Sequence, residues 1–185
     1  MNPISKTFER FKADFEKVIG ESESKLADRI SVHLENFFIE VAQAIENCES
    51  PIEKLISLEL NQAIKQSRLE RMVDVIEVNP QAEVEVYEGR PKERLYRVDL
   101  LVRLTKFISA VDSIEYAFAI ECDGHDYHER TKEQAARDRQ RERDLMNHGI
   151  TVIRFTGSEI YDDPFGCARE AIQIMEHYVQ NIFRF

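Results

Sequence analysis

The chain has 185 residues with a formal net charge of −10, and hydrophobic and charged residues make up 43% and 32% of it. This composition excludes a disordered chain, and no apolar run reaches the roughly 20 residues of a membrane span. The negative charge argues against a general nucleic-acid coat protein. The N-terminal stretch MNPISKTFERFKADF has no continuous apolar segment, so we expect no signal peptide, and three scattered cysteines fit a reduced, cytoplasmic setting.

Residues 5–47 are predicted to be helical. Apolar residues recur at helical spacing on both sides of Gly20, and no glycine or proline interrupts residues 21–50. We interpret residues 1–49 as a helical extension. Its helices form either a hairpin packed on the core or the contact of a homodimer.

Residues 50–185 are predicted to form an α/β domain. The pattern predicts a helix from Ser50, strands at 82–88, 95–104 and 114–122, a charged helix at 131–148, a strand at 150–155 and a final helix capped by Asp163. Three successive strands suggest a meander. The helix before the fourth strand makes a parallel crossover the expected connection.

Acidic residues gather on one surface of this predicted sheet. Strand side chains alternate between faces, and the face opposite Asp99 in strand 95–104 is wholly apolar. Glu121 and Asp123 share a face at the end of the next strand. If the two strands are neighbours, the three acids converge. Glu53 completes an S-x-x-E capping box and lies in the first turn of the preceding helix, from which it can reach the same place.

Carboxylates gathered in one cleft repel each other unless some are protonated or a cation compensates them. A set of oxygen ligands favours Mg²⁺ or Mn²⁺ over zinc. Such an ion can polarise a phosphodiester and lower the pKa of an attacking water. The chemistry that needs this arrangement is hydrolysis of a nucleic-acid backbone.

Four stretches carry a family resemblance: SPIEKL, YRVDLLV, IECDGHDYH and RDRQRERDLMNHGITVIRF, in that order. Together they resemble the PD-(D/E)xK nuclease superfamily, and within it the branch of very-short-patch repair endonucleases and restriction-endonuclease-like proteins. The resemblance covers residues 50–175. It implies a restriction-endonuclease-like core and a Mg²⁺-dependent endonuclease that acts on DNA.

The resemblance also implies roles for single residues. Glu53, Asp99 and Glu121 match the acids that hold the metal, together with the carbonyl of Cys122. His128 follows the Asp-Gly pair, where the branch has a general base or phosphate ligand. Asp99, Glu121 and His128 would therefore be catalytic.

One position departs from the superfamily pattern. Asp123 stands where the superfamily has its lysine, although the branch often has aspartate or histidine there. Asp123 is therefore kept among the catalytic candidates. His125, His128 or a second metal would have to supply the function of the lysine.

Substrate contacts are expected from four side chains. Gln81 matches a glutamine that this branch often carries, and Arg154 matches a basic residue of the last strand. Arg141 belongs to a basic stripe on the charged helix that could face DNA, although that helix also reads as a solvated, salt-bridged one. His125 is the remaining candidate.

Each acid also has a structural alternative. Glu53 can serve as a helix cap alone, and Asp99 can pair with Arg97 or Arg154. The two acids at the end of strand 114–122 can belong to a solvated strand end. The alternative function is a catalytically degenerate nuclease fold used for binding or assembly, which the missing lysine and the acidic charge favour.

Overall fold

The computed structural model describes residues 24–87, 93–124 and 131–182. Its elements are α2 (Ser24–Ile45), α3 (Pro51–Gln66), α4 (Leu69–Met72), β1 (Val75–Tyr87), β2 (Glu93–Phe107), β3 (Ser113–Asp123), α5 (Lys132–Asn147), β4 (Ile150–Thr156), α6 (Gly157–Asp162) and α7 (Pro164–Ile182). The chain divides into two compact units between Glu46 and Asn47. The domain boundary predicted after residue 49 lies slightly further along the chain.

In the N-terminal unit, α2 is an amphipathic helix. Val32, Phe37 and Ile39 expose about half of their surface, and the rings of Phe37 and Phe38 meet edge to face at 6.0 Å. Contact through this helix in a homodimer stays a prediction. Among the described helices, none combines the length and apolarity that a membrane crossing requires.

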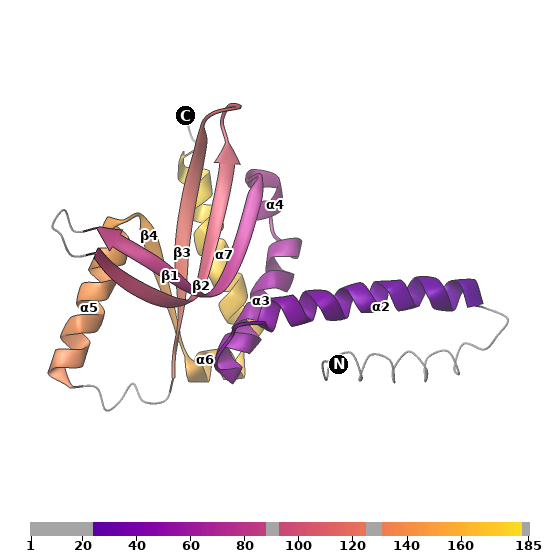
Figure 1. The fold of residues 1–185 in the computed structure, drawn as a ribbon, viewed down its shortest axis with the longest axis horizontal. Helices are drawn as coiled ribbons and strands as arrows, with labels where there is room; N and C mark the ends of the chain where they lie inside the picture. The colour runs from indigo at the N-terminus through magenta and orange to yellow at the C-terminus, as the bar shows by residue number, and fades with distance from the viewer. Residues whose placement is uncertain (1–23, 88–92, 125–130, 183–185) are drawn as a thin grey trace. The chain divides into compact units, whose positions relative to one another are not determined.

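The second unit is built on a four-stranded mixed sheet in the order β1-β2-β3-β4 (Figure 1). β1, β2 and β3 pair antiparallel, and β4 joins β3 in parallel after the α5 crossover. The strands that carry Asp99 and Glu121 are therefore neighbours. The side chain of Asp163 caps α7 by accepting a hydrogen bond from the Gly166 amide at 2.8 Å.

β1 begins earlier than the predicted strand at 82–88. Residues 75–81, which include the Asn79-Pro80 pair, therefore lie outside the predicted strand but belong to β1. β1 is an edge strand, so a proline without an amide hydrogen costs it no ladder bond on its open side. Gln81 follows in a left-handed conformation with φ of 52°, and it drops out of the pairing with β2.

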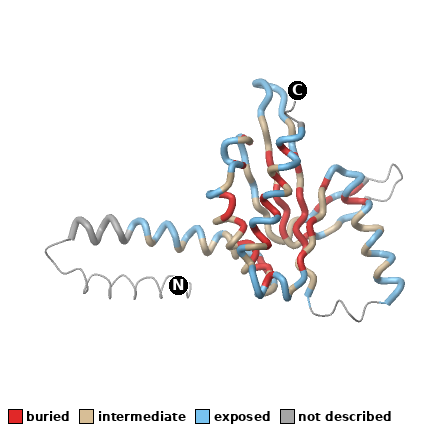
Figure 2. The backbone as a smooth tube through the Cα atoms, turned by 180° about the vertical axis from the view of Figure 1, so that it is seen from behind, coloured by how far each residue is buried: buried red, intermediate tan, exposed pale blue. Residues whose placement is uncertain are grey.

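Two hydrophobic clusters hold helices on both faces of the sheet. Leu100, Val102 and Leu104 pack with α3 and α7, and Leu101 packs with Leu145 of α5. Figure 2 shows the buried positions gathered in the central strands and the helices that cover them.

The predicted single apolar face of strand 95–104 is wrong in one respect. Tyr96 and Val98 pack in the α5 cluster, although alternation puts them on the same side as Leu100. The pairing of β2 with β3 stops at Leu100, and the β1–β2 hairpin bends away toward α5 (Figure 1). Gln81, with its left-handed backbone, lies at this bend. Because the strands turn there, Tyr96 and Val98 face the α5 side of the sheet, whereas Leu100 beyond the bend faces α3 and α7.

Asp144 of α5 ties the bent hairpin to the helix. Its carboxylate is almost fully buried and accepts hydrogen bonds from the Tyr96 hydroxyl at 2.7 Å, Gln140 Nε2 at 2.6 Å and Arg94 Nη1 at 3.1 Å. Burial alone would raise the pKa of Asp144, but these hydrogen bonds and the charge of Arg94 outweigh it and lower the pKa. The network fixes the angle between the hairpin and α5.

Replacing Asp144 with alanine should therefore loosen the hairpin. Three donors would lose their acceptor, and the less exposed of them, Tyr96 and Gln140, would be left unsatisfied at a cost of about 1–3 kcal/mol each, whereas water can replace the acceptor of Arg94, which is 43% exposed. The loss should therefore exceed that of Tyr96→Phe, which removes one hydrogen bond worth about 1 kcal/mol. Urea unfolding of both variants measures the difference. If Asp144→Ala cost no more than Tyr96→Phe, the network would not anchor the hairpin.

Candidate active site

The site begins where β2 leaves β3. The last residue pair of that ladder is Leu100 with Ile120, so the next pair, Asp99 with Glu121, is not joined through the backbone. Asp99 Oδ2 instead accepts a hydrogen bond from the Cys122 amide at 2.7 Å. The bend thus opens a place in the sheet, and a carboxylate holds it open.

Glu53 reaches this place from the start of α3. Ser50 Oγ accepts from the Glu53 amide at 3.3 Å, which is one half of the predicted capping box. The Glu53 carboxylate does not complete the box. It accepts instead from the Glu49 amide at 2.8 Å and from Gln81 Nε2 at 2.7 Å. Gln81 therefore links the β1 edge to the acid of α3, which is a role that the sequence did not suggest.

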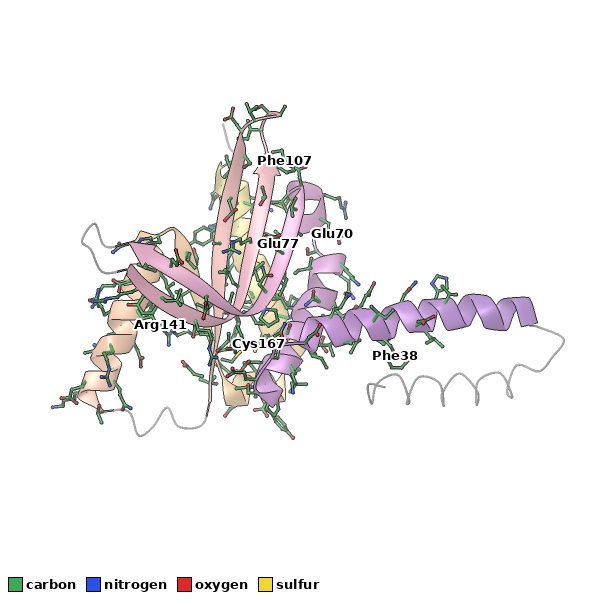
Figure 3. The ribbon with its side chains drawn as sticks, viewed as in Figure 1. Phe38, Glu70, Glu77, Phe107, Arg141 and Cys167 are labelled. Atoms are coloured by element: carbon green, nitrogen blue, oxygen red, sulfur yellow. The ribbon has the colours of Figure 1, made fainter. Side chains whose placement is uncertain are left out.

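Glu121 is buried and paired with Arg141 of α5. Arg141 Nη2 and Nη1 contact the two carboxylate oxygens at 2.8 and 3.0 Å, which is a bidentate geometry. The guanidinium also donates to the carbonyl of Arg97 and lies 5.9 Å from the centre of the Tyr96 ring. Arg141 therefore lies against the acids of the sheet, where α5 meets the bent strands (Figure 3), and its contact with DNA stays a prediction.

Asp123 and Arg154 form a second, looser pair. Arg154 Nη1 lies 3.7 Å from Asp123 Oδ1. In the parallel pairing of the two strands, Arg154 of β4 is the register partner of Glu121 of β3. Among the described residues, buried Arg154 Nε has no hydrogen-bond acceptor. The pairing of Asp99 with Arg97 or Arg154 that the sequence left open is not what the structure has, because Arg97 pairs with Glu49 at 2.8 Å.

The site carries more negative charge than its arginines compensate. Burial raises the pKa of Asp99; the Cys122 amide opposes this, and the charge of Glu53 adds to it. Burial also raises the pKa of Glu121, against the lowering effect of Arg141. Four carboxylates (Glu53, Asp99, Glu121 and Asp123) face two guanidiniums, so one more cation would be accommodated electrostatically.

The carboxylates of the site are the ligands that a hard divalent cation prefers, but their arrangement does not bring three of them together. Among residues 24–87, 93–124 and 131–182, no group of three His, Cys, Asp or Glu side chains lies close enough to hold a metal ion. Both oxygens of Glu121 are held by Arg141. Glu53, Asp99 and Glu121 come from three adjoining elements, whereas His125 and His128 lie outside the described residues.

The inward position of Arg141 had a signal in the sequence. Arg141, Asp144 and Leu145 are spaced i, i+3 and i+4, so they share one face of α5. That face packs on the sheet, because Leu145 is fully buried. The position of Leu145, an apolar residue on the same face as Arg141, was therefore the signal in this charged helix that Arg141 points toward the sheet.

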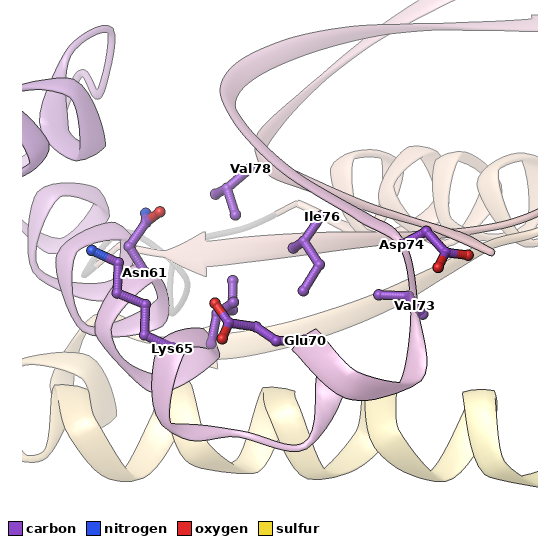
Figure 4. Close-up of a pocket in the computed structure, with 8 residues that line it drawn as sticks. Asn61, Lys65, Glu70, Val73, Asp74, Ile76 and Val78 are labelled. Atoms are coloured by element: carbon purple, nitrogen blue, oxygen red, sulfur yellow. The ribbon is translucent and has the colours of Figure 1, made fainter. Parts of the chain in front are cut away.

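The described residues of this unit line cavities of two sizes that bear on the site. The smaller, of about 250 Å³, is lined by Ile52, Gly124, Gly157, Ser158, Tyr161 and Asp162, so it opens beside the end of β3 and the start of α3. The larger, of about 520 Å³, lies between α3, α4 and β1 (Figure 4). Its Asp74 is bound to Lys106 and to the Phe107 amide. The smaller cavity is the one that adjoins the acids.

The raised pKa of Asp99 predicts a stability change with pH. Folded Asp99 holds its proton more tightly than the unfolded chain does, so ionisation costs stability as the pH rises above about 4. Asp99→Asn keeps an acceptor for the Cys122 amide and removes this cost. We expect the variant to be more stable than the wild type at pH 7 and equal to it below pH about 4, as measured by urea unfolding without metal.

Glu121→Gln is the matched comparison for this experiment. Although burial raises the pKa of Glu121 as well, this variant leaves the buried Arg141 guanidinium without its carboxylate partner, so it should destabilise the protein at pH 7. If Asp99→Asn also destabilised at pH 7, the charge of Asp99 would be fully compensated in the fold, contrary to the excess inferred here.

Comparison with known proteins gives one finding. Residues 76–175, more than half of the chain, match the model of the family REase_MTES_1575, a restriction-endonuclease-like family. The match includes Asp99, Glu121, Arg141 and Arg154, and it begins after Glu53. Neither a curated protein nor a solved structure matches the chain.

Proposed function

The chain belongs to the restriction-endonuclease-like family REase_MTES_1575, and from this premise we propose that it is a metal-dependent endonuclease that hydrolyses phosphodiester bonds in DNA. The family suggests a nuclease. The metal, the DNA substrate and the residue roles are our proposals. We also propose the closer kinship with very-short-patch repair endonucleases and a reduced, cytoplasmic setting, which the free thiols of Cys48, Cys122 and Cys167 favour.

One observation carries the proposal. Asp99 and Glu121 stand side by side on neighbouring strands at the point where those strands separate, and Glu53 is held toward the same place by Gln81. Excess negative charge in a half-buried site stays costly unless a cation enters. A nucleic-acid backbone is the substrate that brings further negative charge to such a site and needs a metal to bind there.

Glu53, Asp99 and Glu121 are the residues that would hold Mg²⁺ or Mn²⁺. The bound ion would polarise the phosphodiester and lower the pKa of the attacking water. The chain fixes two of these ligands beforehand: the Cys122 amide orients Asp99, and the Glu49 amide and Gln81 orient Glu53. Such oriented ligands reduce the entropy that binding costs.

The remaining roles concern protons and phosphate. We propose His128 as the general base or phosphate ligand and His125 as a further substrate contact, since both come within five residues after the end of β3 in the sequence. Arg154 is proposed to contact phosphate through its guanidinium, whose contact with Asp123 Oδ1 is long at 3.7 Å and whose Nε has no acceptor among the described residues. Asp123 orients Arg154, so the acid at the lysine position acts through its neighbour.

Asp99→Ala tests the nuclease. Losing one metal ligand that contributes several kcal/mol to transition-state stabilisation should reduce cleavage at least about a thousandfold. Cleavage of supercoiled plasmid and of short duplexes with Mg²⁺ or Mn²⁺ is the measurement. Asp74→Asn, an acid in the larger cavity, is the matched control and should cleave like the wild type.

The second candidate is a degenerate nuclease fold that binds nucleic acid or a partner without cutting. The observation that favours it is that Arg141 holds both oxygens of Glu121. Wild-type protein that binds DNA but cleaves nothing with either metal, and whose Asp99→Ala variant binds DNA equally well, would support this candidate and contradict the nuclease.

A further inference from the structure

Arg141 occupies the place where a metal ligand is expected. Its two terminal nitrogens contact both oxygens of Glu121, so neither carboxylate oxygen is free of the guanidinium. A divalent cation bound by the same carboxylate would lie close to the guanidinium, and the two positive charges would repel each other in a site of low dielectric. Metal and Arg141 therefore compete for Glu121.

The guanidinium would not leave the site when it loses Glu121. It also donates to the Arg97 carbonyl and lies against the Tyr96 ring, and neither contact involves Glu121. The helix that carries it is fixed to the hairpin by buried Asp144, one turn further along. Arg141 is thus held at the edge of the cleft by its surroundings as well as by its ion partner.

A phosphate matches the donors that Arg141 would release. The planar fork of arginine binds phosphate as it binds carboxylate, through two parallel N–H···O bonds. β3 itself brings no cation to this point, because position 123 is an aspartate that Arg154 contacts. Among the described cations, Arg141 is best placed to exchange its carboxylate partner, Glu121, for a phosphate.

We infer that Arg141 is a counter-ion that a divalent cation displaces from Glu121, and that the displaced guanidinium then binds a phosphate of the nucleic-acid substrate. This inference rests on the proposed function, since it needs a metal at Asp99 and Glu121. It adds an order of events: metal binding frees the cation that the phosphate requires. Metal-free protein keeps Arg141 engaged and has lower affinity for DNA.

Arg141→Gln tests the exchange without any measurement of cleavage. Mn²⁺ titrated by calorimetry should bind the variant at least tenfold more tightly than the wild type, because no resident cation has to be displaced. Without metal the variant should melt lower than the wild type, since buried Glu121 has lost its partner. Added Mn²⁺ should restore more of the melting temperature in the variant than it adds to the wild type.

Arg94→Gln is the matched control. Arg94 also pairs with a buried acid at the interface of α5 with the hairpin, Asp144, but it does not contact Glu121. This variant should melt lower and bind Mn²⁺ like the wild type. Arg141→Lys provides a second variant if Arg141→Gln fails to fold, and it should bind Mn²⁺ more tightly than the wild type because an ammonium forms no bidentate pair.

DNA binding tests the second half of the inference. Fluorescence anisotropy with a labelled duplex, in Ca²⁺ to slow cleavage, should show at least tenfold weaker binding by Arg141→Gln than by the wild type. Without divalent ions the two proteins should bind equally, because Arg141 is then engaged with Glu121 in the wild type. An equal loss with and without metal would contradict the transfer of Arg141 to phosphate.

The outcomes separate this inference from the proposed function. If Arg141→Gln binds Mn²⁺ no more tightly than the wild type while Asp99→Asn abolishes binding, the metal site stands and the exchange is wrong. If neither the wild type nor Arg141→Gln binds Mn²⁺, the metal-dependent nuclease and the exchange both fail.

Discussion

The bidentate pair between Glu121 and Arg141 is the contact on which the arrangement of this unit depends. It joins α5 to the centre of the sheet at the point where β2 departs from β3. The pair stabilises the fold little relative to apolar side chains, because both charges lose water. The pair instead fixes the position of α5 relative to the sheet. The same guanidinium binds the Arg97 carbonyl, so α5, β3 and the β1–β2 hairpin are all held at Arg141. The half-exposed pair of Arg97 and Glu49 cannot do this, since solvent screens it.

The bend that creates the site has a local cause. Gln81 adopts a left-handed conformation, which costs a residue with a Cβ atom free energy unless its surroundings compensate. Here its side chain binds the carboxylate of Glu53, and its neighbours pair normally on either side. The strained backbone of Gln81 and the carboxylate of Glu53 therefore lie in contact at the bend. This combination is expected of a functional site more than of an ordinary edge strand.

The sequence predicted much of the frame. Alternating apolar residues located the four strands, and the adjacency of the Asp99 and Glu121 strands followed from their short connection. Several features escaped, and two of them shape the site. The exchange of sides at Tyr96 and Val98 depends on one backbone torsion at Gln81, which no hydrophobic pattern records. The inward turn of Arg141 was hidden because α5 is dense with charge, and such a helix reads as solvated on every side although one face is buried.

The charges of the site also bear on how an acidic protein can bind a polyanion. In the site, Arg141 is fully engaged by Glu121, so phosphate gains little from this arginine unless a further cation enters. Under the proposed function, binding of metal and binding of nucleic acid would be thermodynamically linked, and each would strengthen the other by the same factor. The net charge of −10 makes this linkage useful, because it weakens contacts with nucleic acid elsewhere on the surface. Affinity would thus be concentrated at the one place where the metal, the acids and the displaced arginine act together.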